Sequence, residues 1–179
     1  RFGNQQLLIL GRIEEVKGHT YLFNALPEVV KIFPEVKLLI IGNGTQQPQL
    51  QQQAATLGIE NNILFLGFQP NPYPFMENSD MMVSPSLYES FGLVFIEAYA
   101  IKLPVIAFDA PAANEIISNN ETGLLVPVYD GSKLAEKIIW LLQNPAERKR
   151  LADAAYEKYI NYFNTNRMVK ETADWYRSV

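Results

Sequence analysis

The sequence predicts an α/β domain with a parallel sheet of six strands and helices on both faces. Short, continuous apolar runs recur along the chain, as is typical of strands that are buried on both faces. Segments whose apolar residues recur at helical spacing lie between these runs, and this alternation indicates strand–helix–strand units. No linker, repeat or hydrophilic break divides the 179 residues, so we expect a single domain that spans residues 1–179.

Six apolar runs are the predicted strands. Three of them end at a glycine, at Gly11, Gly42 and Gly67, where a tight turn can begin. The fourth run ends just before Ser84 and Pro85. The predicted strands cover residues 7–10, 37–41, 63–66, 81–83, 105–108 and 124–126.

Helical spacing accounts for the remaining segments. The first predicted helix contains Pro27, which removes one backbone donor and should bend the helix. Asp130 or Ser132 is the expected cap of the helix after the sixth strand. Asn144 opens the next helix and Asn164 the last one. The helical patterns cover residues 22–33, 50–57, 91–101, 112–117, 134–142, 151–162 and 168–176.

The composition excludes several kinds of chemistry within this chain. There is no cysteine and one histidine, so a cysteine nucleophile, a disulfide or a His-rich metal site cannot be built. The single histidine, His19, is expected at a helix start or on the surface. A net charge of −4 disfavours nucleic-acid binding, and the basic cluster 148–150 is expected to be a solvated helix face. No apolar run approaches the roughly 18 residues of a membrane span.

The segments that follow the predicted strands are the candidate site, because open parallel sheets bind ligands outside the carboxyl ends of their strands. The first of these segments carries two cations, Arg12 and Lys17, which either bind an anion or are ordinary solvated loop charges. Gly42-Asn43-Gly44 follows the second strand and partly matches a dinucleotide fingerprint. Gln47 stands where a third glycine is required, so we interpret this segment as a tight turn.

The start of the helix near Phe91 is the strongest candidate for an anion site. Ser90 is its predicted cap, and the first amides of a helix lack intrahelical partners and carry partial positive charge. We expect Gly92 to leave room for an anion, and Arg12 and Lys17 to neutralise the second charge of a pyrophosphate. The amides expected to point at the ligand are those of Phe91, Gly92, Leu93 and Val94.

Two carboxylates flank this helix start. Glu97 is the only charged residue in the apolar stretch 91–101, where a carboxylate is costly unless it is paired or hydrogen-bonded. It can accept hydrogen bonds from ligand hydroxyls, pair with a core donor or turn to solvent. Glu89 precedes the helix, with seven residues between it and Glu97. Together the two could bracket a diphosphate and accept hydroxyl protons on either side of it, which suits a sugar nucleotide.

At this point the chain resembles the retaining glycosyltransferases of group 1 (family 4). The segment Glu89–Glu97 is similar to the E-x7-E signature of that family. One departure is Ala110–Ala113, where relatives often carry glycines, and it bears on any backbone contact from this loop to the sugar. The resemblance covers nearly the whole chain, through Gly11-Arg12, Lys17-Gly18, Ile41–Gly44, Phe65–Gly67, Pro85–Tyr88, Leu103–Ala107, Asn114–Ile117 and Thr122–Val126.

This resemblance implies a Rossmann-like domain that forms the C-terminal, donor-binding half of a GT-B fold. The N-terminal acceptor domain is then absent from this chain, which begins with Arg1 rather than Met. Arg12 and Lys17 would hold the donor diphosphate, Glu89 would contact the transferred sugar, and these three are the implied catalytic residues. Glu97 would take the ribose hydroxyls. The other implied substrate-binding residues are Phe91, Gly92, Leu93, Val94 and Gly42, with Phe68 and Gln69 bordering the base.

The implied reaction transfers a hexose from a nucleotide diphosphate sugar to an acceptor, with retention at the anomeric carbon. No metal or cofactor is expected, since an arginine and a lysine neutralise the leaving phosphate. The implied partners are the nucleotide sugar, the N-terminal domain and an acceptor that is a glycan, a lipid or a small molecule, so the isolated domain should be nearly inactive. We expect a cytoplasmic location, with contact to the inner membrane face through the N-terminal half. The alternatives are a GT-B nucleotide-sugar 2-epimerase half and a non-catalytic nucleotide-binding α/β domain.

Overall fold

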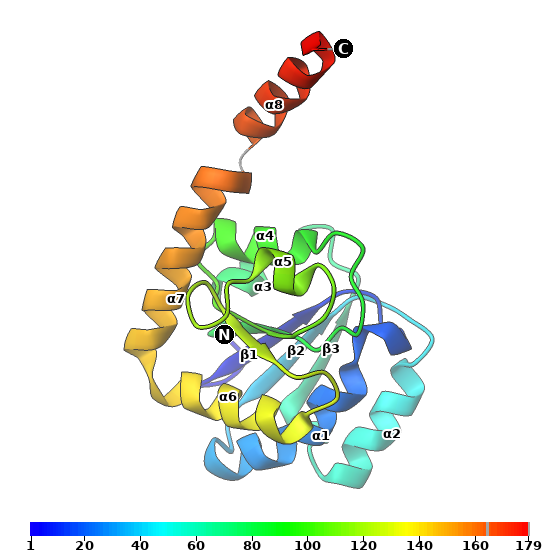
Figure 1. The fold of residues 1–179 in the computed structure, drawn as a ribbon. Coiled ribbons are helices and arrows are strands. Elements are labelled where there is room, and N and C mark those ends of the chain that lie inside the picture. The colour runs from blue at the N-terminus through cyan, green and yellow to red at the C-terminus, as the bar shows by residue number, and fades with distance from the viewer. Residues whose placement is uncertain (164, 179) are drawn as a thin grey trace.

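Six parallel strands form a single sheet in the order β3-β2-β1-β4-β5-β6. The computed structural model describes residues 1–163 and 165–178 of the chain (Figure 1). Each observed strand starts and ends within one residue of its prediction, so the predicted parallel sheet is confirmed. The strands are β1 (Gln6–Leu10), β2 (Lys37–Ile41), β3 (Ile63–Gly67), β4 (Met81–Ser84), β5 (Val105–Phe108) and β6 (Leu124–Val126).

Helices connect all of these strands. One short helix, α3, was not predicted from the spacing, because its five residues are too few to show a helical period. The predicted cap Asn164 lies outside the described residues. The α-helices are α1 (His19–Ile32), α2 (Gln47–Leu57), α3 (Tyr73–Glu77), α4 (Leu93–Ala100), α5 (Ala113–Ile116), α6 (Gly131–Gln143), α7 (Pro145–Lys158) and α8 (Thr165–Ser178). Two 3₁₀ helices, η1 (Glu15–Lys17) and η2 (Glu60–Asn62), and one π-helix, η3 (Tyr159–Phe163), complete the described elements.

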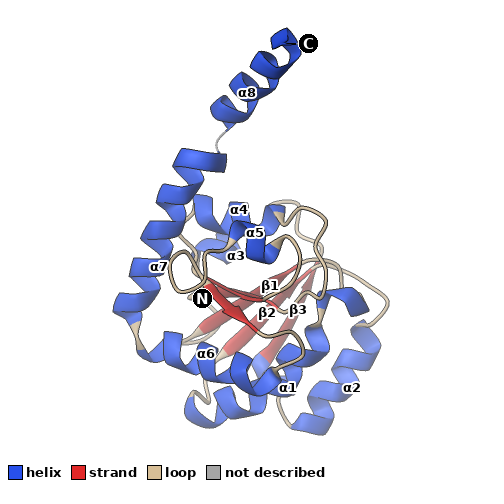
Figure 2. Ribbon diagram, viewed as in Figure 1, coloured by secondary structure: helices blue, strands red, loops and turns tan. Residues whose placement is uncertain are grey.

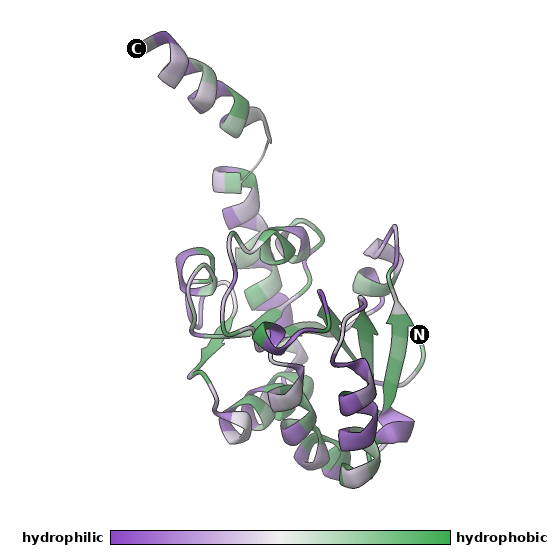
Figure 3. Cartoon of the chain, turned by 90° about the vertical axis from the view of Figure 1, so that its right-hand side faces the viewer, coloured by the Kyte–Doolittle hydropathy of each residue, from purple (hydrophilic) through white to green (hydrophobic). Residues whose placement is uncertain are grey.

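The helices cover both faces of the sheet (Figure 2). Helices α1, α2 and α6 pack on one face, and α3, α4, α5 and part of α7 pack on the other. Successive residues of β1 point into different cores, since Leu7 and Ile9 join the first and Leu8 joins the second. A strand with apolar residues on both sides is hydrophobic along its whole length, as the strands in Figure 3 are. This explains why the strands were visible as continuous apolar runs.

The order of the strands defines where a ligand can bind. The chain builds outward from β1 through β2 to β3, then returns to the other side of β1 with β4 and continues to β6. The loops after β1 and β4 therefore leave the sheet in opposite directions and open a crevice between them. Arg12 and Lys17 follow β1, and Glu89 follows β4. The topology thus brings the predicted diphosphate and sugar residues to one crevice.

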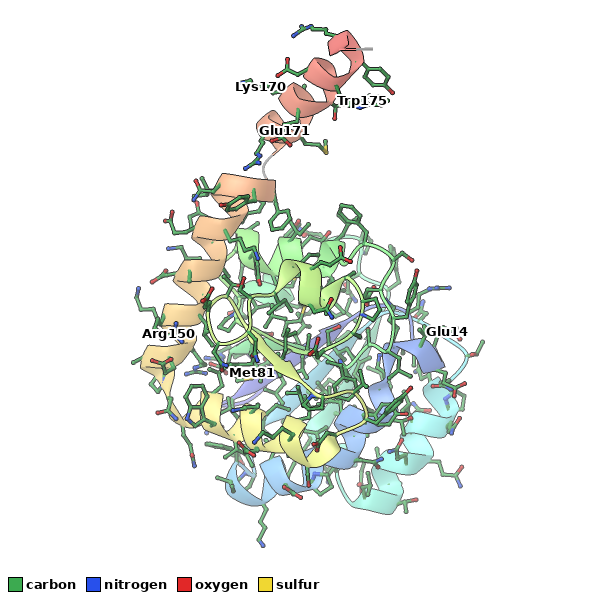
Figure 4. All side chains as sticks on the ribbon, in the orientation of Figure 1. Glu14, Met81, Arg150, Lys170, Glu171 and Trp175 are labelled. Atoms are coloured by element: carbon green, nitrogen blue, oxygen red, sulfur yellow. The ribbon has the colours of Figure 1, made fainter. Side chains whose placement is uncertain are left out.

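The last helix, α8, extends away from this body (Figure 1). The described side chains of α8, including Lys170, Glu171 and Trp175, project on several sides of the helix, away from the rest of the described chain (Figure 4). Trp175 is 62% exposed, which is unusual for so large an apolar side chain. Among the described residues no helix is both long enough and apolar enough to cross a membrane.

Candidate functional site

Two loops meet at the crevice between β1 and β4. The amide of Leu87 donates to the carbonyl oxygen of Val16 at 2.8 Å, which ties the loop after β4 to the loop after β1. Gly18 has φ +69° and lies against the carbonyl group of Pro85, where a Cβ atom would overlap that group. Glycine is therefore required here both by the backbone conformation and by the close approach.

This junction brings Lys17 and Glu89 together. The Nζ atom of Lys17 lies 2.6 Å from Oε1 of Glu89, and the two side chains are 18% and 12% exposed. Ser86 Oγ donates to the same carboxylate oxygen at 2.9 Å. Lys17 and Glu89 were predicted to bind different parts of a ligand, and the structure shows that they also pair with each other. Ser86 was missed by the sequence reasoning, although its position three residues before a loop glutamate is a spacing at which local side-chain bonds form.

A cavity of about 410 Å³ opens beside Glu89 on the side of β5 and α5. Glu89 and Phe91 are the predicted site residues that line it. Glu115 and Phe163 also line this cavity and had not been predicted as site residues. The full lining consists of Tyr88, Glu89, Ser90, Phe91, Ile96, Pro111, Ala112, Glu115, Ile116 and Phe163.

A second cavity, of about 460 Å³, lies at the carboxyl ends of β1, β2 and β3. It contains four of the predicted residues: Arg12, Gly42, Phe68 and Gln69. The Phe68 ring is 71% exposed, and the amide of Gln69 is fixed by donating from Nε2 to the carbonyl oxygen of Leu66 at 2.7 Å. The remaining lining residues are Leu10, Gly11, Ile41 and Asn43. The predicted base-side and sugar-side residues thus lie in two cavities, one on each side of the crevice.

The glycines after β2 serve packing. A Cβ atom on Gly42 would overlap the carbonyl oxygen of Gly11, and one on Gly44 would overlap the backbone of Ile13. The loops after β1 and β2 are therefore in direct backbone contact. The carboxylate of Glu14 fastens them further, by accepting hydrogen bonds from the amide and hydroxyl of Thr45 that hold its pKa below the usual value. These contacts agree with the interpretation of Gly42–Gly44 as a tight turn.

Helix α4 starts later than predicted. Its cap is Gly92, in a left-handed conformation with φ +72°, and no side chain caps the helix, so the prediction of Ser90 as cap is wrong. The first helical residues are Leu93 and Val94, whose amides lack intrahelical partners by helix geometry. The space that a Cβ on Gly92 would need is occupied by the side chains of Phe95 and Ile116. Packing and backbone conformation therefore favour a glycine here, and the room for an anion at this helix start stays a prediction.

Glu97 lies on α4 one turn beyond Leu93. Its side chain is half-buried, and the desolvation raises its pKa above the usual value for glutamate. Among the described residues it forms no hydrogen bond or ion pair, so the expected alternative of a core donor as partner is not found. Glu97 lines neither of the two cavities. Among the described residues, then, no hydrogen bond or ion pair offsets the cost of burying this carboxylate.

His19 was expected either at a helix start or on the surface. It is the first residue of α1, and it does not lie on the surface. Its side chain is 1% exposed, and neither ring nitrogen has a hydrogen-bond partner among the residues that the structure describes. Burial, with a smaller contribution from the charge of Lys17, lowers the pKa of His19 to about 4. The imidazole is consequently neutral at physiological pH.

The loop that departs from the family pattern keeps a backbone conformation suited to glycine. Ala112 has φ +65°, which a residue with a Cβ rarely adopts. Pro111 and Ala112 nevertheless line the same cavity as Glu89. The backbone of this loop therefore borders the cavity, although alanines stand where relatives often carry glycines. Within the described residues, no cluster of three or more His, Cys, Asp or Glu side chains could hold a metal ion.

Known proteins with similar sequences and structures identify the family. The family described as "Glycosyl transferases group 1" matches residues 3–158. The phosphatidyl-myo-inositol mannosyltransferase of Mycobacterium leprae is 38% identical over 160 residues, which is 87% of this chain and 42% of that protein. The chain therefore belongs to the group 1 glycosyltransferases.

Solved structures agree with this assignment. The structure of HepE from Anabaena in complex with UDP superimposes with a TM-score of 0.93 at 26% identity, over 99% of this chain and 50% of that one. The C-terminal domain of the group 1 glycosyltransferase LpcC from Francisella tularensis gives a TM-score of 0.83 at 29% identity, over 91% of this chain and 88% of that domain. The chain thus spans half or less of the length of the mannosyltransferase and of HepE, and the expected Rossmann-like fold is confirmed.

Proposed function

We propose that this chain is the donor-binding, C-terminal domain of a retaining hexosyltransferase that uses a nucleoside diphosphate sugar. The observation that carries the proposal is the junction of Lys17 and Glu89 at the crevice between β1 and β4, with one cavity on each side. The structures of HepE in complex with UDP and with UDP-glucose support a nucleotide sugar as the ligand. The match to a C-terminal domain supports the assignment of the chain to that half.

The two cavities suggest how the donor lies. The base and ribose would occupy the cavity with Phe68 and Gln69, whose exposed ring offers a face for stacking. The diphosphate would cross the crevice, where Arg12 and Lys17 offset its charge and the first amides of α4 donate hydrogen bonds. The hexose would enter the cavity beside Glu89, whose carboxylate can accept hydrogen bonds from sugar hydroxyls.

The chemistry of the transfer follows from this arrangement. When the bond between the anomeric carbon and the diphosphate breaks, negative charge develops on the leaving oxygen. Two cations and a helix start can stabilise this charge without a metal ion, which is why we expect none to be needed. Retention at the anomeric carbon and the role of Glu89 and Glu97 as an E-x7-E pair are part of this proposal. The family match favours glycosyl transfer over the epimerase and the non-catalytic binding domain.

The acceptor site would belong to the N-terminal domain that the resemblance implies. The proposed chain therefore binds donor but transfers little or no sugar by itself. A cytoplasmic location, with contact to the inner membrane face through the N-terminal half, stays a prediction of the resemblance.

Calorimetry tests the proposal directly. We expect the 179-residue chain to bind at least one of UDP-glucose, GDP-mannose and ADP-glucose, and the preferred nucleotide identifies the base. Glu97→Ala should weaken this binding by about 1.5–3 kcal/mol, the contribution of hydrogen bonds from ribose hydroxyls to a charged acceptor. A chain that folds normally and binds none of the three nucleotides would contradict the proposal, and so would turnover of sugar by this chain alone.

A further inference from the structure

Ser86 has no role in the function proposed so far, although its hydroxyl donates to Glu89. It lies two residues after the end of β4, at the strand end where the crevice opens. Its side chain is 5% exposed, and its hydroxyl oxygen is also 3.4 Å from the buried hydroxyl of Ser84. The loop after β4 therefore carries a short chain of hydroxyl groups that leads from the sheet to Glu89.

The contacts of Glu89 are unevenly divided between its two oxygens. Both Lys17 Nζ and Ser86 Oγ contact Oε1, at 2.6 and 2.9 Å. Among the described residues Oε2 has no hydrogen-bond partner, and Glu89 lines the cavity assigned to the hexose. One oxygen is thus fixed by the protein and the other is available to a ligand.

Binding of the donor changes this balance. A bound diphosphate would compete with Glu89 for the ammonium group of Lys17 and so weaken the 2.6 Å contact between Lys17 and Glu89. When Lys17 turns toward the phosphate, Ser86 remains as the protein donor on Oε1. The Ser86 hydroxyl group lies in the loop after β4 and carries no charge, so a diphosphate attracts it far less than it attracts the ammonium group of Lys17.

We propose that Ser86 is a positioning residue, which holds Glu89 by Oε1 so that Oε2 stays directed at the hexose after Lys17 has moved to the diphosphate. This inference rests on the proposed function, because it requires that a nucleotide sugar binds at the crevice. Ser86 acts only on the sugar end of the ligand. It should therefore leave the affinity for the nucleoside diphosphate unchanged.

The test compares two ligands on each variant. For the nucleotide that binds best among UDP, GDP and ADP, calorimetry on the 179-residue chain gives the Kd of the diphosphate and of its hexose derivative. The Kd of the diphosphate divided by the Kd of its hexose derivative measures the affinity that the hexose adds. Ser86→Ala should reduce this ratio by about two- to tenfold, the range for one hydrogen bond, and change the Kd of the diphosphate by less than twofold.

Matched variants separate positioning from a structural effect. Ser84→Ala removes a buried hydroxyl group at the end of β4. This hydroxyl contacts Ser86 but not Glu89, so its removal should reduce the ratio less. In a Glu89→Ala background, Ser86→Ala should have no further effect, because the residue through which it acts is gone. If Ser86→Ala does not fold, Ser86→Cys keeps the size of the side chain with a weaker donor, and should give a smaller drop in the ratio.

The outcomes are distinguishable. An unchanged ratio in the folded Ser86 variant overturns the inference, and so does an equal loss of affinity for both ligands, which is the result of a structural role. A wild-type chain that binds diphosphate and sugar nucleotide equally well also overturns it, since Glu89 then contributes nothing to the sugar. Failure of the wild-type chain to bind any of these nucleotides refutes the proposed function itself.

Discussion

Gly18 and the carbonyl group of Pro85 lie so close together that no Cβ atom fits between them. This contact joins the loop that carries Lys17 to the loop that carries Glu89, and it fixes the width of the crevice from the backbone. The two loops follow strands that are far apart in the sequence, so the contact depends on the pairing of β1 with β4.

Gly18→Ala should therefore destabilise the chain by more than the conformational strain of placing alanine at a positive φ, because its Cβ would also overlap the carbonyl group of Pro85. Gly58 is the matched control, because its φ of +67° is nearly that of Gly18 and nothing lies within 4 Å of a Cβ placed there. Urea unfolding should show a loss of about 1 kcal/mol for Gly58→Ala, and clearly more for Gly18→Ala, whose Cβ must push two loops apart. Equal losses for the two variants would show that the contact with Pro85 does not constrain the loops.

Ala112→Gly should stabilise the chain, against the usual effect of introducing glycine. Ala112 holds φ +65°, which costs about 1–3 kcal/mol for a residue with a Cβ, and glycine removes this strain at an entropic cost of about 1 kcal/mol. Ala113→Gly, at the first position of α5, is the control and should destabilise, since there glycine only adds freedom to the unfolded chain. The midpoints of urea unfolding measure both effects, and a loss of stability for Ala112→Gly contradicts the prediction.

Glu97→Gln should raise the stability of the ligand-free chain while it weakens nucleotide binding. Burial raises the pKa of Glu97 in the folded chain, so the stability it contributes is present below the pKa of the unfolded chain and is lost as the pH rises through the folded value. The melting temperature of Glu97→Gln should consequently exceed that of the wild type at pH 7, and the difference should shrink toward pH 4.

The same variant should bind the nucleotide about tenfold more weakly, because a neutral amide is a poorer acceptor for ribose hydroxyls than a carboxylate. Glu157→Gln, which neutralises an exposed carboxylate on α7, should change neither the binding nor the melting temperature appreciably. Unchanged binding in Glu97→Gln would remove Glu97 from the proposed ribose site.

His19 should make the chain sensitive to mild acid. Its pKa of about 4 lies below the usual 6.5, so the unfolded chain takes up a proton from pH 6.5 downward before the folded chain does. The stability due to neutral His19 is therefore complete above pH 6.5 and decreases by about 3 kcal/mol as the pH falls to 4. His19→Gln does not titrate, so subtracting its urea-unfolding free energies from those of the wild type isolates this contribution. A difference that is constant with pH would mean that His19 is accessible to protons in the folded chain.

Much of the fold was predictable because a parallel sheet buries both faces of its strands. Continuous apolar runs such as Leu38–Ile41 then have few interpretations, and the glycine that ends this run, Gly42, is required by its contact with the carbonyl oxygen of Gly11. The start of α4 was misplaced because Ser90 is a good cap by type, whereas Gly92 takes the position through a left-handed conformation that spacing does not reveal. Helix α3 was missed because five residues give no periodicity.

The candidate site was predictable as a set of residues but less so as a set of contacts. Sequence order placed Lys17 and Glu89 at the same edge, since both follow strands that end there. It did not show that they would pair with each other, because that depends on the junction of Gly18 with Pro85 and of Val16 with Leu87. The burial of His19 was missed for the same reason, as it depends on packing between segments that are distant along the chain. Ser86 is a different case, because its contact with Glu89 spans only three residues and was overlooked.

The order of the strands also has a consequence for how the chain is made. The strand at the centre of the sheet, β1, is synthesised first, and its neighbour β2 follows after one helix, whereas β4 arrives only after β3 and α3. Until then the backbone N–H and C=O groups along the edge of β1 that will pair with Met81 and Met82 are open to any other strand in the vicinity. A nascent chain arrested before β4 should therefore aggregate or recruit a chaperone, and the crevice that binds the donor cannot exist until this late pairing closes the sheet.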